Sequence, residues 1–231
     1  MKIYIWDYAY IYNRQRISFF KKNIENIENK KIQKVLDLGC GDKPFKNFFD
    51  KKVEYIGIDI SKESRADIIL DLNTQKIPFP DEFFDLVIAS EIIEHIYNQD
   101  FFFKEMIRVV KKSGYIYIST PFMFPQHDPF RDYYRYTELF YKEKLPSIGI
   151  NISDIEPSNT IISTCLVFCN LIIRGLSLPK ILKYLFHIFN NFLSLLAEKI
   201  LDSKILANKK IIIDKIKRAP IGVLVFGQKF T

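Results

Sequence analysis

Five short apolar runs between Val35 and Thr120 are the feature that most limits how this chain can fold. The runs are VLDL, YIGIDI, ADIIL, FDLVIAS and YIYIST, separated by segments with turn or helix patterns. Runs of this length, rich in Ile, Val and Tyr, are typical of buried strands. Strands that alternate with helices predict a parallel sheet with helices on both faces. The sequence therefore predicts an α/β fold.

The rest of the chain continues this alternation. DFFFKEMIRVVKKSG has helical spacing, and Gly114 is predicted to end that helix. TELFYKEKLPSIGI predicts a further helix, NISDIEP a sixth strand and IGVLVFGQKF an apolar strand near the end. We expect an N-terminal helical cap over 1–33, a core over 34–159 and 219–231, and an inserted helical subdomain over 160–218.

Composition places the chain among globular proteins. Of the 231 residues, 48% are hydrophobic and 15% aromatic, which excludes a disordered chain. The three cysteines, Cys40, Cys165 and Cys169, show no framework spacing, so we expect reduced thiols in the cytoplasm, the last two in the core. The first residues contain no uninterrupted apolar region, so no signal peptide is expected.

The positive charge is concentrated near the C-terminal end. The segment from Lys199 to Arg218 holds seven cations and two anions, a net +5 of the chain's +7. Such a segment is compatible with a nucleic acid, an anionic membrane, an acidic substrate or a solvated surface.

A glycine-rich turn follows the first predicted strand. VLDLGCGDKPF places Asp37, Gly39 and Gly41 there, and glycines let a backbone approach a ligand closely. Asp59 ends the next strand, 18 residues after Gly41, where a carboxylate can accept hydrogen bonds from ribose hydroxyls. Asp71 follows the third strand, where it could meet an adenine edge. Parallel sheets bind ligands at this edge.

These motifs, in this order and spacing, resemble the class I S-adenosylmethionine-dependent methyltransferases of the branch called methyltransferase type 11. The resemblance covers Val35 to about Phe122, with weaker matches to Pro157 and at the last strand. It implies a Rossmann-like, seven-stranded, mostly parallel sheet with a reversed last strand, an apolar helical insertion before that strand, and S-adenosyl-L-methionine as cofactor.

The resemblance also implies which residues bind the cofactor. In the family, the first motif holds the methionine moiety, the acid after the second strand holds ribose, and the acid after the third contacts adenine. The corresponding residues, with those beside them and after the fourth strand, are Asp37, Gly39, Gly41, Asp59, Ile60, Asp71, Leu72, Ser90 and Glu91. Lys43-Pro44 replaces the family's third glycine, so entry into the following helix departs from the family pattern.

Two histidines are candidates for acid–base chemistry. A hydroxyl or amine acceptor needs a base within hydrogen-bond reach, whereas a carboxylate needs none. Because histidine is the side chain that ordinarily exchanges a proton near neutral pH, His127 and His95 are the predicted catalytic residues. As an alternative, Glu91, Glu94 and His95 would share one face if SEIIEHI were helical, and with His127 could bind a divalent metal.

That alternative is similar to metal-dependent O-methyltransferases of ubiquinone synthesis and of small-RNA 3′ ends. The same string also occurs in family members without a metal. We therefore favour no metal, with Glu91 near the cofactor and His95 packed and hydrogen-bonded.

The segment TPFMFPQHDPFRDYYRYT follows the fifth strand and emerges at the cofactor edge. It resembles a segment of many bacterial members, which place acceptor-binding residues there. Its aromatic rings can stack on a ring or sugar, and its charges can orient polar atoms. The predicted substrate-binding residues are Asp132, Tyr133, Tyr134, Arg135 and Tyr136, of which some, with Asp132, could brace the loop by an ion pair.

The segment from Thr160 to Leu206 interrupts the alternation. It predicts two helices split around Gly175 and Pro179, and the second has a wide apolar stripe. An apolar helical pair beside lysines is typical of an interfacial membrane-binding element. A helical cap packed on the core, or a homodimer face, fits the same pattern.

We expect methyl transfer to oxygen on a sugar or lipid-linked small molecule, such as a surface-glycan precursor, a quinone precursor or a glycolipid. The expected location is the cytoplasm, with peripheral contact at the inner face of the membrane. The alternatives are an RNA methyltransferase and a non-catalytic cofactor-binding module. Nucleic acid is disfavoured because isoleucines rather than aromatics separate the basic residues.

Overall fold

The computed structural model describes residues 4–27, 32–201 and 220–230. The chain forms two compact units. One comprises Phe19–Glu156 with Val223–Thr231, and the other comprises Lys2–Ser18 with Pro157–Gly222. The predicted domain boundaries, 1–33, 34–159 with 219–231, and 160–218, stay a prediction.

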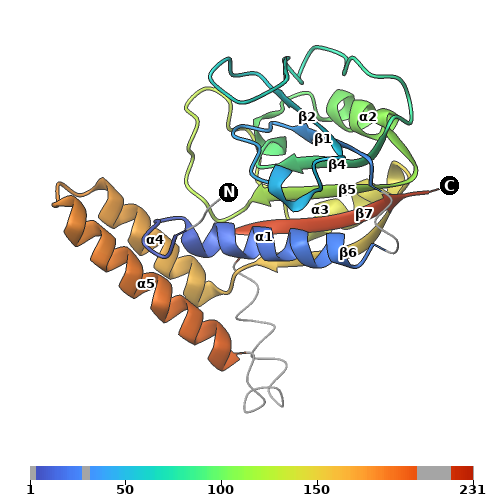
Figure 1. Cartoon of the computed structure of the whole chain (residues 1–231). Coiled ribbons are helices and arrows are strands. Elements are labelled where there is room, and N and C mark those ends of the chain that lie inside the picture. Colours follow the sequence, from blue (N-terminus) through green and yellow to red (C-terminus); the bar gives the residue numbers. More distant parts are fainter. Residues whose placement is uncertain (1–3, 28–31, 202–219, 231) are drawn as a thin grey trace. The chain divides into compact units, whose positions relative to one another are not determined.

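Seven strands form one sheet in the order β3-β2-β1-β4-β5-β7-β6 (Figure 1). The pairs β1/β2, β1/β4, β2/β3 and β4/β5 are parallel. The strands are β1 (Lys34–Leu38), β2 (Glu54–Asp59), β3 (Ile68–Ile69), β4 (Phe84–Ser90), β5 (Val110–Pro121), β6 (Ile150–Ser158) and β7 (Gly222–Lys229). The predicted Rossmann-like fold is confirmed.

Strand β7 runs opposite to both of its neighbours. Against β6, the Phe230 N–H donates to the Gly149 carbonyl at 3.0 Å and the Ile221 N–H to the Ser158 carbonyl at 3.1 Å. Against β5, the Gln228 side chain donates a hydrogen bond to the Ser113 carbonyl, and the ring of Phe226 stacks on the ring of Tyr115. In both cases residue numbers increase along β7 while those of the contacted residues on the neighbouring strand decrease, which is the pattern of antiparallel pairing.

Alternating residues of the strands build a core on each face of the sheet. On one face, Leu36 and Leu38 pack with residues of α2 (Gln99–Val109) and α3 (Glu138–Ser147). On the other, Val35 and Tyr117 pack with Phe19 and Phe20 of α1 (Tyr10–Glu25). Successive side chains of a strand point to opposite faces, so each strand serves both cores.

The prediction that Gly114 ends a helix is wrong. Helix α2 ends at Val109, and the chain continues directly into β5, which contains Gly114. Val110 is buried and pairs with Phe84, so long-range pairing of a β-branched residue prevails over the local glycine signal. Register shifts where Leu86 pairs with Tyr115.

The turn after β1 leads into a short helix only. The chain forms the 3₁₀ helix η2 (Lys46–Phe48) instead of the α-helix expected there. Lys43, at the position of the family's third glycine, has a φ of +55° and its Nζ lies 2.5 Å from an Asp67 carboxylate oxygen. This ion pair joins the buried Lys43 side chain to the half-exposed Asp67 and fixes the turn that follows the strand.

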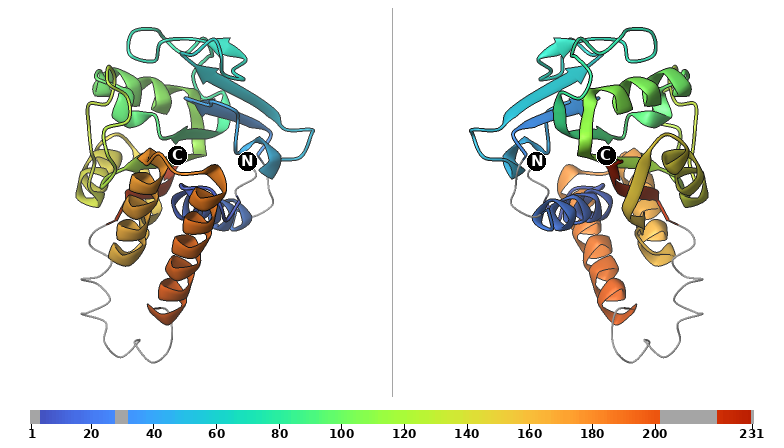
Figure 2. Two further views of the ribbon diagram at one scale, coloured as in Figure 1. Left: turned by 90° about the vertical axis from the view of Figure 1, so that its left-hand side faces the viewer. Right: turned by 90° about the vertical axis from the view of Figure 1, so that its right-hand side faces the viewer.

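Two helices, α4 (Ile161–Gly175) and α5 (Lys180–Leu201), form the insertion before the last strand, as predicted. Figure 2 shows them as two long helices joined by a tight connection. Cys165 and Cys169 on α4 are exposed, so their assignment to the core is wrong. The basic positions from Lys204 to Arg218 lie outside the described residues. Among the helices described, none has the length and apolar character needed to cross a membrane.

Candidate functional site

A cleft of 220 Å³ lies beyond the carboxyl ends of the central parallel strands. Parallel strands bring these ends to one edge of the sheet, which is why residues distant in sequence meet there. The cleft gathers many of the predicted residues: Gly39, Asp59, Ile60, Asp71, Leu72, Glu91 and His95. Asn73, Ile92, Asp128 and Arg131 also line it and were not predicted.

The turn after β1 is held against β2. The N–H groups of Gly39 and Cys40 both donate to the Ile58 carbonyl, at 2.8 and 3.0 Å. Gly39 has a φ of +68°, and a Cβ added there would lie 2.7 Å from the Cβ of Ile92. Only glycine fits this position. Gly41 does not line the cleft, but its N–H donates to Asp59 Oδ2 at 2.9 Å.

The carboxylates of Asp59 and Asp71 are oriented by the backbone. Asp59 Oδ1 also accepts from the Ser61 N–H at 2.8 Å, and Asp71 Oδ1 accepts from the Asn73 N–H at 2.9 Å. A carboxylate has about four lone-pair sites, so each retains acceptor capacity toward the cleft. Hydroxyl and amino groups of a nucleoside are suitable donors.

Asp37 and Ser90 lie near the cleft but do not line it. Asp37 is buried and accepts a hydrogen bond from the Tyr55 hydroxyl, whose pKa is raised chiefly by burial. Ser90 Oγ lies 2.8 Å from Ser119 Oγ. Their predicted contacts with the cofactor stay predictions, as does that of Gly41.

Glu91 is fixed by Ser119, which was not predicted although it lies in the YIYIST run. The Glu91 N–H donates to the Ser119 carbonyl, and Ser119 Oγ donates to Glu91 Oε1 at 2.8 Å. Glu91 has a φ of +55° and precedes the 3₁₀ helix η3 (Ile93–His95). It therefore does not share a helix face with Glu94 and His95, and the condition for the four-residue metal site is not met.

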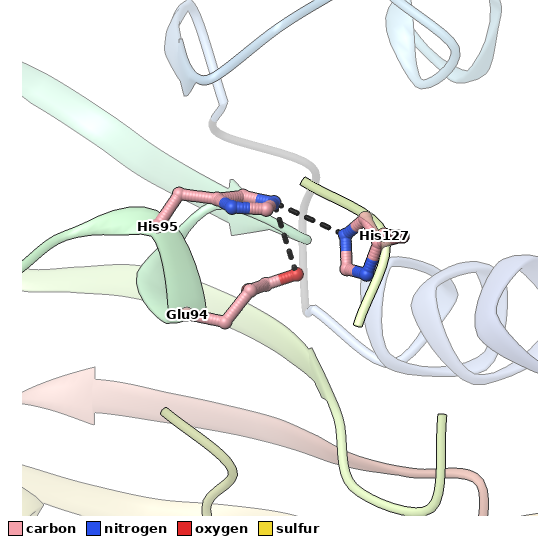
Figure 3. A group of neighbouring side chains, drawn as sticks. All are labelled: Glu94, His95 and His127. Carbon is pink, nitrogen blue, oxygen red and sulfur yellow. Dashed lines mark hydrogen bonds and ion pairs between the residues drawn. The ribbon is translucent and has the colours of Figure 1, made fainter. Parts of the chain in front are cut away.

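Glu94, His95 and His127 nevertheless form a compact group (Figure 3). The Nε2 atoms of the two histidines are 3.2 Å apart, and His95 Nε2 lies 3.7 Å from Glu94 Oε1. The Glu94 side chain is fully buried, and neither of its carboxylate oxygens has a hydrogen-bond partner among the described residues. Burial raises the pKa of Glu94 well above its ordinary value.

The outer nitrogens of both imidazoles face hydrogen-bond acceptors. His95 Nδ1 contacts the Arg131 carbonyl oxygen, and His127 Nδ1 lies 3.3 Å from Asp132 Oδ2. Both Nδ1 atoms thus face acceptors, and the two Nε2 atoms are directed at each other. This arrangement suits a cation between the rings, either a shared proton or a metal ion.

The loop that carries His127 is braced from within. Asp132 accepts from the His127 N–H at 3.0 Å and pairs with Arg135, whose Nη2 lies 2.8 Å from Asp132 Oδ2. This pairing lowers the pKa of Asp132 to about 2, so the carboxylate is ionised. The predicted internal ion pair is present. The N–H of Tyr133 donates to the Glu94 carbonyl at 2.9 Å and joins this loop to η3.

The three tyrosines of the loop differ in position. Tyr133 and Tyr134 are exposed, whereas Tyr136 is buried with its ring centroid 4.4 Å from that of Phe140. Tyr136 thus belongs to the core, and the acceptor-binding role predicted for the five loop residues stays a prediction.

Comparison with known proteins finds similarity to methyltransferases. Residues 36–118 match the family model described as "Methyltransferase domain". The ubiquinone biosynthesis O-methyltransferase of Pelagibacter ubique is 32% identical over 130 residues, 47% of this chain and 53% of that protein. A ubiquinone/menaquinone biosynthesis C-methyltransferase of Shewanella sediminis is 32% identical over 77 residues, 33% of this chain and 29% of that protein.

Solved structures agree on the fold. An O-methyltransferase from a Brevibacillus brevis polyketide synthase, in complex with S-adenosyl-L-homocysteine, matches with a TM-score of 0.57 and 18% identity, over 96% of this chain and 76% of that chain. Residues 36–118 therefore match a methyltransferase domain in sequence. The resemblance to class I S-adenosylmethionine-dependent methyltransferases that the motifs predicted is confirmed. The sequence matches cover about half or less of these relatives' lengths.

Proposed function

We propose that this chain transfers a methyl group from S-adenosyl-L-methionine to a hydroxyl oxygen of a small or lipid-linked acceptor. The proposal extends the named activities of the partial relatives, which act on oxygen in one case and on carbon in another. The cofactor supplies a methyl group already activated on a sulfonium, so the protein mainly contributes position and a dry site.

The cleft residues suit the cofactor. Gly39 leaves room where a side chain would collide, and Asp59 and Asp71 present oriented acceptors. Asp59 would accept hydrogen bonds from ribose hydroxyls and Asp71 from the adenine edge. Glu91, held by Ser119, would lie against the methionine moiety.

The proposal of a hydroxyl acceptor rests on the pair of histidines, His95 and His127. A carboxylate acceptor needs no base, whereas a hydroxyl must lose its proton during transfer. His95 lines the cleft, and its Nε2 lies 3.2 Å from Nε2 of His127. The pair can take up one proton and hold it between two nitrogens. Asp132 orients His127 from behind, and Glu94 adds a buried carboxyl group beside the shared position.

A sugar, a surface-glycan precursor or a lipid-linked ring compound fits this chemistry. Such acceptors offer hydroxyl groups and flat faces, and the exposed rings of Tyr133 and Tyr134 provide stacking surfaces beside the site. The alternatives remain an RNA methyltransferase and a cofactor-binding module without turnover.

The test uses methyl-tritiated S-adenosyl-L-methionine with the purified chain and a host-cell lysate. The labelled product is then treated with mild alkali. A methyl ether keeps its label, which is the expected result. A methyl ester releases volatile methanol and would rule out the hydroxyl acceptor, because no base is needed to make an ester from a carboxylate.

One observation favours a second candidate, a divalent metal held by Glu94, His95 and His127. Their ligating atoms lie within 4.8 Å of one another, and each imidazole directs its other nitrogen to a carbonyl or carboxylate, as metal-binding histidines do. Ligands of tetrahedral zinc lie roughly 3.3 Å apart, close to the spacing of the two Nε2 atoms. Such a metal would orient and acidify the acceptor hydroxyl.

The metal content of the purified protein distinguishes a bound metal from a shared proton and requires no activity assay. Elemental analysis of the purified chain after dialysis with zinc or manganese is compared with that of a His127→Gln variant. Stoichiometric metal in the wild type that is lost in the variant supports the metal. Equal, substoichiometric metal in both supports the shared proton.

A further inference from the structure

The helical hairpin of α4 and α5 has a polar interior. The buried polar side chains are Ser163, Thr164, Asn170, His187, Asn190, Asn191 and Ser194. Asn170 is their centre: its Oδ1 accepts from Asn190 Nδ2 at 3.0 Å and contacts His187 Nδ1 at 3.1 Å, while its Nδ2 donates to Asn191 Oδ1 at 2.9 Å. Hydrogen bonds between side chains thus join the two helices.

The same network continues toward the open end of the hairpin. Ser194 Oγ donates to Ser163 Oγ at 2.7 Å, and Ser163 Oγ donates to Glu198 Oε1 at 3.0 Å. Glu198 pairs in turn with Arg14 at 3.0 Å. Asn191 also donates to backbone carbonyls of Ile5 and Asp7, which ties the N-terminal segment to α5.

The exterior of the hairpin is apolar. On α5, Ile181 is 72% exposed, Phe189 59% and Phe192 57%, and further large apolar side chains share this face. On α4, Ile161, Ile162 and Ile172 are exposed. The hairpin therefore has the reverse of the usual arrangement in water, where apolar side chains pack inside and polar ones face solvent.

An apolar solvent accounts for this arrangement. Within lipid, polar groups must find partners inside the protein, and apolar side chains are solvated by the acyl chains. We propose that the α4–α5 hairpin inserts its exposed apolar face into one leaflet of an anionic membrane. The helices lie in the interfacial layer and do not cross the membrane.

The width of the apolar face favours lipid over a second copy of the chain. At about 100° per residue, the exposed apolar side chains of α5 from Ile181 to Ile200 cover an arc of about 200°. A helix–helix seam buries a much narrower stripe. A bilayer can cover the whole arc at once.

Charge complements an anionic headgroup layer. The hairpin carries Arg174, Lys180, Lys183 and Lys199, and within its described residues Glu198 is the only acid, already paired with Arg14. Trp6 and Tyr4, in the segment tied to α5, are exposed and stacked with ring centroids 4.7 Å apart. Exposed Trp and Tyr are enriched at membrane–water interfaces.

The test is co-sedimentation with vesicles of phosphatidylcholine containing 30 mol% phosphatidylglycerol. The double variant Phe189→Glu, Phe192→Glu is compared with the matched control Leu139→Glu, which changes an equally exposed apolar residue on α3. The wild type and the control are expected to bind. Binding by the double variant is expected to fall at least about tenfold, because two large apolar side chains no longer enter lipid.

Two reporters test insertion directly. Trp6 is the single tryptophan of the chain, and its emission should shift to shorter wavelength with vesicles. A fluorophore on exposed Cys165 or Cys169 should be quenched by nitroxide-labelled lipids. Cys40 should stay unlabelled, because it is buried and burial raises its thiol pKa to about 12.

Three results would overturn the proposal, each obtained with protein that still binds S-adenosyl-L-homocysteine. The wild type could stay in solution with both reporters unchanged. Vesicle binding could survive the double substitution, which would show attraction by charge alone. Sedimentation velocity could show a lipid-independent dimer that the double variant abolishes, which would assign the face to a second copy. None of these assays depends on turnover, so they stand apart from the proposed methyl transfer.

Discussion

Replacing Gly39 by alanine puts a methyl group where the structure has no space for it. The added Cβ would lie 2.7 Å from Cβ and Cγ1 of Ile92 and 2.8 Å from its Cδ1. Favourable carbon contacts begin near roughly 3.5 Å. The φ of +68° is strained for alanine at a cost of about 1–2 kcal/mol, and overpacking adds about 1–3 kcal/mol. We expect a total loss of about 2–5 kcal/mol in the free energy of unfolding.

Gly41→Ala is the matched control. Gly41 has a φ of +47°, but no atom lies within 4 Å of an added Cβ, so only the backbone cost of about 1–2 kcal/mol applies. Urea unfolding of both variants measures the difference, and calorimetric titration with S-adenosyl-L-homocysteine measures binding. Because Ile92 lines the cleft, Gly39→Ala should also weaken binding by about tenfold or more, equivalent to about 1.4 kcal/mol. Equal stability losses at both positions, or unchanged binding by Gly39→Ala, would show that Ile92 does not restrict the space beside Gly39.

Three further predictions concern the site. Asp59→Ala removes the acceptor of the Gly41 and Ser61 N–H groups and should raise the Kd for S-adenosyl-L-homocysteine at least about tenfold, measured by calorimetry; unchanged affinity would remove Asp59 from the cofactor site. His127→Gln should lower methyl incorporation about 10²-fold or more while that Kd stays constant, whereas an equal loss of both would indicate a binding role. Glu94→Gln should raise Tm at pH 8 but not at pH 4. Burial raises the pKa of Glu94 in the folded state above the unfolded value of 4.5, so the wild type loses stability as the pH rises above 4.5, and the variant does not. A variant less stable than wild type at pH 8 would show that Glu94 is ionised and paired there.

The sequence predicts well which residues meet at the cleft, because the signal is local. Asp59 and Asp71 each follow an apolar run directly, and parallel strands carry their ends to the same place. Gly114 shows where local signals fail. Its helix-ending pattern is genuine, but the pairing of Val110 with Phe84 depends on a strand 26 positions earlier in the chain.

The histidine pair and the hairpin depend on information that a sequence pattern does not contain. His95 and His127 were both candidates, but their contact depends on the path of a loop braced by Asp132 and Arg135. The apolar stripe of α5 was also predicted. A periodic pattern defines a face and not the medium that it meets, so the polar interior around Asn170 became visible only in the structure.

The proposed methyl transfer to a small or lipid-linked acceptor is tested by following tritiated methyl groups from S-adenosyl-L-methionine into separated lysate fractions. The organic-extractable, polysaccharide, RNA and protein fractions are counted after incubation with the wild type and with Asp59→Ala. We expect label in the organic-extractable or polysaccharide fraction, and we expect it to be lost with the variant. Label in RNA, or no label in any fraction from a wild type that binds S-adenosyl-L-homocysteine, would contradict it.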